Sequence, residues 1–519
     1  MDSTRRMVLV QGGVIGAGII ANSLSSVAAL AALDTKPQRR SLRGLAWKDP
    51  IVATYRDAVG IMKQTPPTDK FKFNWVQLAN IHGSNRGYRY CPHGNWYFLP
   101  WHRAYTAMYE RIVRDLTKND AFAMPFWDWT ADPLMPEVFL SEKTPDGKTN
   151  WLYVNEDGTK RTWPANRPMP PDVVGPKVLT DILKDTPYEI FGTSRPRGQD
   201  SLDPSWIINR GGVQGLLERT PHNTVHNNIG GWMPTPASPR DPIFFMHHCN
   251  FDRIWAVWNL QFQNSKDRLW ADMPFKDNFL NVDGSLWSPQ VSDLYVPETL
   301  GYTYGLKPLV TAFAATAQPH LLALQNKLTT FFASPRLAGT ASEGVTAISV
   351  DTTKTATPTD PLVVPIQVPE EALIAVAHRN PVGSGVEVMD FSAALEEAAS
   401  GTRAKAFLRD VAVTDPRTTE FRVFIGRDNL NADTPVTDPH YVGMFSVLDH
   451  GEGGDGANGG HAAPSFVLDL TDAIQRVHGS GERPPGLIQL QLLPVLNEAA
   501  IGKAGTATPK RVEVIFVSV

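Results

Sequence analysis

The sequence predicts two structured domains: a mainly α domain with long loops, followed by an antiparallel β-sandwich. In the first half of the chain, apolar residues recur at helical spacing, and histidines stand on the same helical faces. All 14 tryptophans lie between Trp47 and Trp287, which indicates an aromatic-rich core confined to that half. After about residue 365, short runs of β-forming residues alternate with turn-forming clusters, as in a small sandwich.

Four helices are expected in the first domain, and each of them carries histidines. The first lies near residues 71–82, where aromatic and apolar residues share one face with a histidine. The second is introduced by Pro100. The other two begin with a capping residue followed by proline, which is a favoured helix start: Thr220-Pro221 and Asp241-Pro242.

The second domain is expected to span residues 366–519. Its strands are predicted at 421–425, 441–448, 465–470, 487–493 and 512–519, where β-forming residues run together. Residues 306–365 are interpreted as a connecting segment and linker, because the stretch from about 340 is rich in Thr, Ala and Pro. The glycine-rich stretch 451–460 follows no strand-to-helix pattern and is interpreted as a flexible loop.

The composition is that of a globular protein and excludes some classes of partner and site. The chain has 519 residues, of which 42% are hydrophobic and 20% charged, enough to bury a large core. Its net charge of −4 provides no basic field for nucleic acid, so none is expected as a partner. Two cysteines are too few for a disulfide framework or a thiolate metal cluster.

The first 31 residues are similar to a twin-arginine export signal. Arg5 and Arg6 stand directly ahead of the uncharged stretch 7–33, and Ala29-Leu30-Ala31 offers a small-x-small cleavage pattern. An uncleaved membrane anchor is the alternative, because the stretch is long enough to span a bilayer. Its four glycines and its polar residues favour removal. The mature protein is therefore expected in the periplasm or secreted, without stable membrane association.

Seven of the 13 histidines form two tight groups: His82, His93 and His102, then His222, His226, His247 and His248. His222 and His226 are four residues apart, so a helix projects them from one face. A single histidine is more often a core or surface residue than a ligand, but packing alone does not easily produce the joint pattern. Along one helix His247 points about 100° away from His248, so the two are not expected to share an ion.

Two groups made only of imidazoles favour copper, which binds nitrogen ligands most strongly among the divalent first-row metals. Di-iron bundles use carboxylate-rich Glu-x-x-His sets, which do not accompany these helices. Zinc peptidases of the H-E-x-x-H type need Glu after the first histidine, whereas Asn223 follows His222. The predicted metal site is therefore a dicopper centre.

Three long and specific motifs run from Cys91 to Tyr105, from Pro221 to His226 and from Ser238 to Trp255. Together they resemble the tyrosinase and polyphenol oxidase family of type 3 copper proteins. The resemblance covers about residues 45–305, ends in a tyrosine motif at 300–304, and implies a four-helix bundle around a dicopper site. The strand-rich region is similar to the carboxy-terminal domain of plant members, which implies that it could shield the active site.

The resemblance also implies the metal ligands: His82, His93 and His102 for the first copper, and His222, His226 and His248 for the second. His247 would be a neighbouring residue that does not bind the metal. Cys91 matches the cysteine that forms a thioether with the histidine corresponding to His93, and a free buried thiol is the alternative. Cys249 is interpreted as core packing.

Glu218 and Asn223 match the residues that orient a water molecule in the family, which implies assistance in removing the phenol proton. A solvated loop carboxylate is the alternative for Glu218. Thr235 aligns with the gate over the second copper, and Phe244 could form an apolar wall at the substrate site or belong to the ordinary core. Asp252 could orient a ligand histidine or pair with Arg253 or Arg240.

The resemblance implies copper-dependent oxidation of small phenols with dioxygen as co-substrate, giving o-quinones from o-diphenols and hydroxylating monophenols at the ortho position. A catechol-only oxidase is one alternative. A hemocyanin-like dioxygen carrier is another, because the same centre carries dioxygen without turnover when substrate cannot reach it. A binding protein that had lost its metal would lack a ligand, and none is missing. The sequence identifies no copper-delivery partner.

Overall fold

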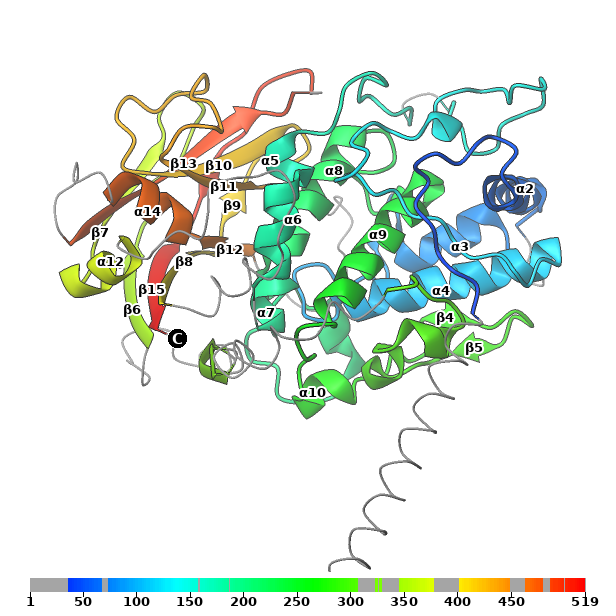
Figure 1. Cartoon of the computed structure of the whole chain (residues 1–519), viewed down its shortest axis with the longest axis horizontal. Helices are drawn as coiled ribbons and strands as arrows, with labels where there is room; N and C mark the ends of the chain where they lie inside the picture. Colours follow the sequence, from blue (N-terminus) through cyan, green and yellow to red (C-terminus); the bar gives the residue numbers. More distant parts are fainter. Residues whose placement is uncertain are drawn as a thin grey trace, which may run out of the picture.

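The computed structural model describes residues 36–518 except 68–72, 157–158, 186, 307–322, 325, 329–344, 378–400, 449–462, 479–485 and 499. A helical domain and a strand-rich domain lie side by side, at the right and the left of Figure 1. The predicted export signal, the glycine-rich loop and most of the connecting segment fall outside the described residues. In the described part of the chain, no helix is long and apolar enough to cross a bilayer.

Three long helices form the centre of the helical domain: α2 (Pro50–Gln64), α4 (Phe98–Thr117) and α9 (Ile243–Trp258). The α4 helix packs against both of the others, and Tyr109 stacks on Phe245 of α9 with 3.7 Å between ring centroids. Asp241 accepts a hydrogen bond from the Ile243 amide, which agrees with the predicted capped start of α9.

The prediction of a regular four-helix bundle is not confirmed. Of the four helices expected to carry histidines, α4 and α9 are long. The remaining two, α3 (Trp75–His82) and α8 (Asn223–Ile229), have only eight and seven residues. Short elements and long loops complete the domain. These elements are β1 (Gly83–Ser84), β2 (Gly87–Tyr88), η1 (Glu137–Phe139), α5 (Pro171–Val174), α6 (Pro176–Leu183), α7 (Tyr188–Phe191), η2 (Pro204–Ile208), η4 (Ser238–Arg240), α10 (Arg268–Ala271), β4 (Phe279–Leu280), β5 (Leu286–Trp287), η5 (Val291–Leu294) and η6 (Pro297–Leu300).

The helix that carries His222 and His226 does not begin at Thr220-Pro221 as predicted. The chain is already helical at Leu216, and a π-helical turn, η3 (Glu218–His222), leads into α8. Pro221 lies inside this turn and has no backbone N–H, so it cannot donate the regular helical hydrogen bond. A π-helical turn accommodates such a position without ending the helix.

The strand-rich domain consists of two sheets, ordered β11-β10-β13-β7 and β3-β12-β8-β15-β6. The strands are β3 (Val213–Gln214), β6 (Val345–Asp351), β7 (Leu362–Gln367), β8 (Thr402–Arg409), β10 (Thr419–Ile425), β11 (Tyr441–Phe445), β12 (Ser465–Asp469), β13 (Leu487–Leu496) and β15 (Arg511–Ser518). Apolar side chains from both sheets share one core, in which Phe445 stacks on Phe421 and Phe466. This is the predicted β-sandwich, with one parallel pairing: β3 belongs to the helical domain and runs parallel to β12.

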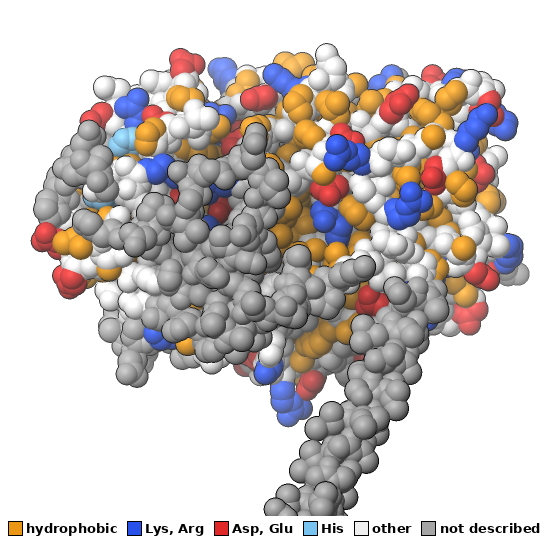
Figure 2. Space-filling model, in the orientation of Figure 1, with side chains coloured by type: hydrophobic (Ala, Val, Ile, Leu, Met, Phe, Trp, Pro, Cys, Tyr) orange, Lys and Arg blue, Asp and Glu red, His pale blue; other side chains and the backbone are white. Residues whose placement is uncertain are grey.

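The strand-rich domain begins earlier than predicted, because β6 and most of β7 lie within the predicted segment 306–365. In β7, Leu362, Val364 and Ile366 are buried and alternate with exposed residues, which is the period of a half-buried strand. The Thr-rich composition between the two strands obscured this alternation in the sequence. The smaller elements of the domain are α12 (Glu370–Ala377), β9 (Ala412–Val413), α14 (Thr471–His478) and β14 (Ala507–Thr508). On the described part of the face in Figure 2, Lys and Arg side chains are interspersed with Asp and Glu.

Candidate metal centre

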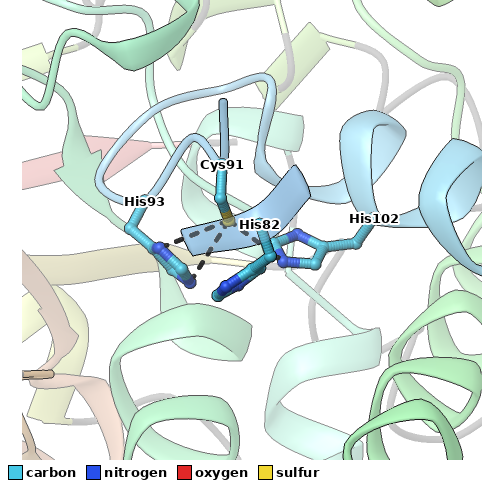
Figure 3. A group of neighbouring side chains, drawn as sticks. All are labelled: His82, Cys91, His93 and His102. Atoms are coloured by element: carbon cyan, nitrogen blue, oxygen red, sulfur yellow. Dashed lines mark hydrogen bonds between the residues drawn. The ribbon is translucent and has the colours of Figure 1, made fainter. Parts of the chain in front are cut away.

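The first histidine group is assembled from α3, the loop before α4, and the first turns of α4. His82 is the last residue of α3, His93 lies in the loop, and His102 lies on α4 (Figure 3). The candidate ligand atoms of these histidines and Cys91 all lie within 4.8 Å of one another. All four side chains are buried. The structure therefore brings together the three histidines predicted for the first metal.

The second group is assembled from η3, α8 and α9. Ring nitrogens of His222, His226 and His247 lie within 4.8 Å of one another. His248 also reaches this group, since its Nε2 is 3.2 Å from Nε2 of His226. The ring of His248 stacks on His102 with 4.3 Å between centroids, so the two groups are adjacent.

His247 lies beside the second group, as expected of a neighbouring residue, and its ring nitrogens are also close enough to make it a candidate ligand. Its ring centroid is 4.8 Å from that of His226 and 5.7 Å from that of His222. The corresponding distances for His248 are 5.4 and 5.1 Å. Neighbouring positions on α9 point in different directions, but His222 and His226 come from η3 and α8, and their rings lie near both positions. The geometry therefore makes both His247 and His248 available to the second group.

Hydrogen bonds orient four of the candidate ligands through their Nδ1 atoms. His82 donates to the carbonyl of Pro236 at 2.7 Å, and His226 donates to the carbonyl of Met233 at 2.6 Å. His102 donates to the Phe98 carbonyl and His222 to Oδ1 of Asn223, both at 2.8 Å. Because carbonyl oxygens only accept, the proton lies on Nδ1 and the Nε2 lone pair is left for a metal.

The protonation states also fit metal binding. Burial lowers the pKa of His102 to about 3 and that of His226 to about 4, so both rings are neutral at physiological pH. Neutral imidazole is the form that binds metals. Among the described contacts, the buried Nε2 atoms of His82 and His222 have no hydrogen-bond partner. A polar atom buried without a partner is costly, and a metal ion would satisfy both.

Cys91 lies against the ring of His93. Its Sγ atom is 3.5 Å from Nδ1 and 3.9 Å from Nε2 of that ring, and 3.3 Å from Nε2 of His102 (Figure 3). Burial raises the pKa of the Cys91 thiol well above its ordinary value. Because both nitrogens of His93 flank Cε1, the sulfur faces the edge of the ring that contains this carbon. Cys249 is buried on α9, as its interpretation as core packing requires.

Glu218 is fully buried, so the alternative of a solvated loop carboxylate is wrong. Burial raises its pKa to about 8, although its oxygens accept hydrogen bonds from the Gly94 amide at 2.7 Å and from the Thr193 hydroxyl. Asn223 bonds to His222, Gln214 and Ser446, and none of the described hydrogen bonds joins it to Glu218. Gly94 and Thr193 carried no signal in the sequence.

The two predicted gate residues lie in different surroundings. Thr235 is half-buried, and its hydroxyl donates to the Trp232 carbonyl at 2.8 Å, within the loop whose carbonyls hold His82 and His226. Phe244 is fully buried, with its ring centroid 4.1 Å from that of His248 and 5.2 Å from that of His82. Phe244 therefore lies against both histidine groups.

Asp252 does not contact a ligand histidine, Arg253 or Arg240 among the described interactions, so those expectations are wrong. It forms ion pairs with Arg103 and Arg39, and it accepts hydrogen bonds from the hydroxyls of Tyr302 and Tyr304, both at 2.6 Å. Burial opposes ionisation, but Arg103 and Arg39 hold the pKa of Asp252 below its usual value. This cluster connects α4 and α9 to residues from the beginning and from the end of the helical domain's sequence.

Comparison with known proteins identifies a known domain within the helical part of the chain. The family profile described as the common central domain of tyrosinase matches residues 72–261. The chain therefore carries a tyrosinase central domain. It is 31% identical over 241 residues to the tyrosinase HcTyr1 of Hahella sp. (strain CCB-MM4), covering 41% of this chain and 47% of that protein. It is 30% identical over 299 residues to the chloroplastic polyphenol oxidase of Vitis vinifera, covering 49% and 45%. The matched region thus spans about half the length of these tyrosinase-family relatives.

Solved structures show a similar fold over almost the whole chain. A latent aurone synthase (polyphenol oxidase) from a natural source matches with a TM-score of 0.58 at 18% identity, covering 93% of this chain and 90% of that one. Latent apple tyrosinase matches with a TM-score of 0.56 at 19% identity, covering 93% and 97%. The tyrosinase domain implies a type 3 dinuclear copper centre, and the buried, neutral imidazoles of the two groups fit that cofactor.

Proposed function

We propose that this tyrosinase-family chain oxidises small phenols with dioxygen, converting o-diphenols to o-quinones and hydroxylating monophenols at the ortho position. The observation that carries the proposal is the adjacency of two buried imidazole groups, linked by the stacked rings of His102 and His248. Two copper ions supply the exchange of electrons with dioxygen when bound there.

The proposed ligands are His82, His93 and His102 for the first copper and His222, His226 and His248 for the second. The Nδ1 hydrogen bonds support this assignment. Each of them fixes the orientation of one ring and leaves the lone pair on its Nε2 atom free for a metal. His247 is the alternative third ligand of the second copper. We also propose a thioether between Cys91 and Cε1 of His93, which the position of Sγ supports.

Glu218 is the proposed acceptor of the phenol proton, through a water molecule that Asn223 helps to orient. A pKa of about 8 leaves enough ionised carboxylate at neutral pH to accept a proton and makes the protonated form a competent acid in return. Phe244 forms the proposed apolar wall, and Thr235 is the proposed gate. The surrounding core excludes bulk water from the proton transfer.

Two alternatives are distinguished by one assay of the copper-loaded full chain. Catechol and its matching monophenol are added before and after limited proteolysis in the connecting segment, and initial rates of quinone formation are compared. Quinone from both substrates supports the full proposal, and quinone from catechol alone indicates a catechol-only oxidase. Reversible dioxygen binding without quinone in either sample indicates a carrier. Uptake of fewer than two coppers per chain would refute all three.

We further propose that the chain is exported by the twin-arginine route and that the signal is removed. The support is the motif of Arg5 and Arg6 ahead of the uncharged stretch. Replacing both arginines by lysine should retain the protein in the cytoplasm, which cell fractionation would detect.

A further inference from the structure

The carboxy-terminal domain forms hydrogen bonds directly with the helix that carries His222 and His226. Residues 444–447, here called the clamp segment, are the last two residues of β11 and the two that follow, and they lie along η3 and α8. The Ser446 amide donates to the Arg219 carbonyl at 2.9 Å, within the π-helical turn. The Thr220 hydroxyl donates to the Met444 carbonyl at 2.7 Å, and the Thr224 hydroxyl to Oγ of Ser446 at 3.0 Å.

Asn223 connects the clamp segment to a candidate metal ligand. Its Nδ2 donates to the carbonyl of Ser446 at 2.8 Å and to Oε1 of Gln214 at 2.9 Å. Its Oδ1 faces Nδ1 of His222 at 2.8 Å. A side-chain amide has two donor hydrogens on one side and an acceptor on the other. The two acceptors at Ser446 and Gln214 therefore determine that the oxygen, and not the NH₂ group, faces His222.

One acceptor belongs to the carboxy-terminal domain and the other contacts it. Ser446 is part of that domain, whereas Gln214 lies on β3 of the helical domain, where it pairs with Phe466 of β12 and with Thr193 of its own domain. Asn223, Gln214 and Ser446 are all at least 95% buried, so water does not replace these hydrogen bonds while the domain is docked. The orientation of Asn223 is thus set jointly by its own domain and by the contact with Ser446.

We propose that docking of the carboxy-terminal domain positions His222 for the second metal, with Ser446 and Gln214 acting as positioning residues through Asn223. The oxygen of Asn223 keeps the hydrogen of His222 on Nδ1, so the lone pair on Nε2 can bind the metal. An amide that is free to turn can also present its NH₂ group to Nδ1, and this arrangement favours the tautomer with hydrogen on Nε2. That tautomer cannot bind a metal through Nε2.

The first metal group does not depend on this connection. His82 and His102 are oriented by the carbonyls of Pro236 and Phe98, which belong to the helical domain itself. Weakening the contact between the domains should therefore affect the second metal selectively. This inference rests on the proposed copper function of the two groups.

The test compares copper affinities of the full chain and its variants. Gln214→Leu removes the acceptor on β3, and Gln214→Glu keeps an acceptor oxygen at the same place. Ser446→Pro removes the amide that bonds to Arg219 and displaces the clamp segment, whereas Ser446→Ala removes only the hydroxyl. Copper retained during titration with a competing chelator is measured, and far-UV circular dichroism reports whether each variant is folded.

We expect Gln214→Leu and Ser446→Pro to bind the second copper about 10- to 100-fold more weakly and the first copper with unchanged affinity. Gln214→Glu and Ser446→Ala should bind both coppers like the wild type. Folded Gln214→Leu protein with wild-type affinity for both coppers overturns the inference. If Ser446→Pro does not fold, the copper affinities of Gln214→Leu alone test the inference. If the wild type itself takes up fewer than two coppers, the proposed function fails instead.

Discussion

The carbonyl oxygen of Pro236 accepts a hydrogen bond from Nδ1 of His82 at 2.7 Å. Three residues earlier, the carbonyl of Met233 holds Nδ1 of His226 at 2.6 Å. One short loop thus orients a histidine of each group through its backbone. Any change that displaces residues 233–236 should disturb metal binding even though it replaces no ligand.

Gly83→Ala is expected to displace this loop. A Cβ atom at residue 83 would lie 2.6 Å from the Pro236 carbonyl oxygen, too close for an unchanged backbone. The oxygen that orients His82 must then move, so we expect the first copper to bind at least about 10-fold more weakly. Chelator titration measures this affinity, and Ser84→Ala is the neighbouring control. Unchanged binding by folded Gly83→Ala protein would contradict the role of the loop.

Asp252→Asn should destabilise the helical domain strongly. The substitution removes the charge that pairs with Arg39 and Arg103, whose side chains are fully buried. Breaking a buried ion pair from one side costs about 3–5 kcal/mol, because the remaining charge loses its partner. Here that charge is Arg103, since Arg39 keeps its ion pair with Glu110. Chemical denaturation measures the free energy of unfolding. Asp128→Asn is the control: its pair with Arg253 is partly exposed, and its loss should cost less than about 1 kcal/mol.

Glu218 should determine the pH dependence of the oxidation. Because burial raises its pKa to about 8, the ionised form that accepts a proton increases as the pH rises through this value. We expect kcat to rise through about pH 8, where half of the Glu218 carboxylate is ionised, and to level off only at higher pH. Glu218→Gln should lower kcat by about 10²- to 10⁴-fold and abolish the rise.

Thr193→Val provides the matched control for Glu218. It removes a hydroxyl that donates to the carboxylate, so the rise in kcat should shift to higher pH without disappearing. A Glu218→Gln profile that parallels the wild type would exclude Glu218 as the proton acceptor.

Glu189 on α7 should make the protein less stable as the pH rises. Burial raises its pKa from 4.5 to about 7, so the folded state holds this proton more tightly than the unfolded state does. The free energy of unfolding is therefore highest below pH 4.5 on account of this group and falls as the pH rises to about 7. In the Glu189→Gln variant, the decrease in the free energy of unfolding between pH 4.5 and about 7 should be smaller by up to about 3 kcal/mol. Urea unfolding at these two pH values measures the difference. Glu371→Gln, at an exposed position, should leave the pH dependence unchanged.

The proposed thioether between Cys91 and His93 should change the mass of the peptide that contains both residues. In copper-loaded protein that is then denatured, the peptide with Cys91 and His93 should be lighter by two hydrogen atoms and should resist alkylation. The reason is that the sulfur already lies beside the His93 ring edge that carries Cε1. A thiol at residue 91 that still alkylates would show that the cysteine is free.

The parts of the site that the sequence predicted are encoded locally. His222 and His226 are four residues apart and lie on one helical stretch, and their rings come within 4.6 Å of each other as expected. The strands predicted at 421–425 and 465–470 match β10 and β12 closely, because their residues favour strands and turns flank them. Strand β8 gave a weaker signal, since its Arg403 and Lys405 are buried charges.

The parts that the sequence did not predict depend on contacts between distant residues. Asn223 and Ser446 are 223 positions apart, and no periodicity connects them. Arg39 bonds to Asp252 across 213 positions, from a segment without any recognisable pattern. At Pro221 the local pattern predicted a helix start. The chain is instead already helical at Leu216, so Pro221 lies within the helix, which the pattern around Pro221 alone does not reveal.

The pairing of β3 with β12 makes the two domains share a sheet, and Lys405 adds a buried ion pair with Asp185 of the helical domain at 2.6 Å. A protease that cuts the chain between the domains therefore leaves this main-chain ladder and this ion pair intact. The nicked halves should elute together from a sizing column as one non-covalent complex. Separating them would require denaturant or a second cut within the sandwich, so a single cleavage is not equivalent to loss of a domain.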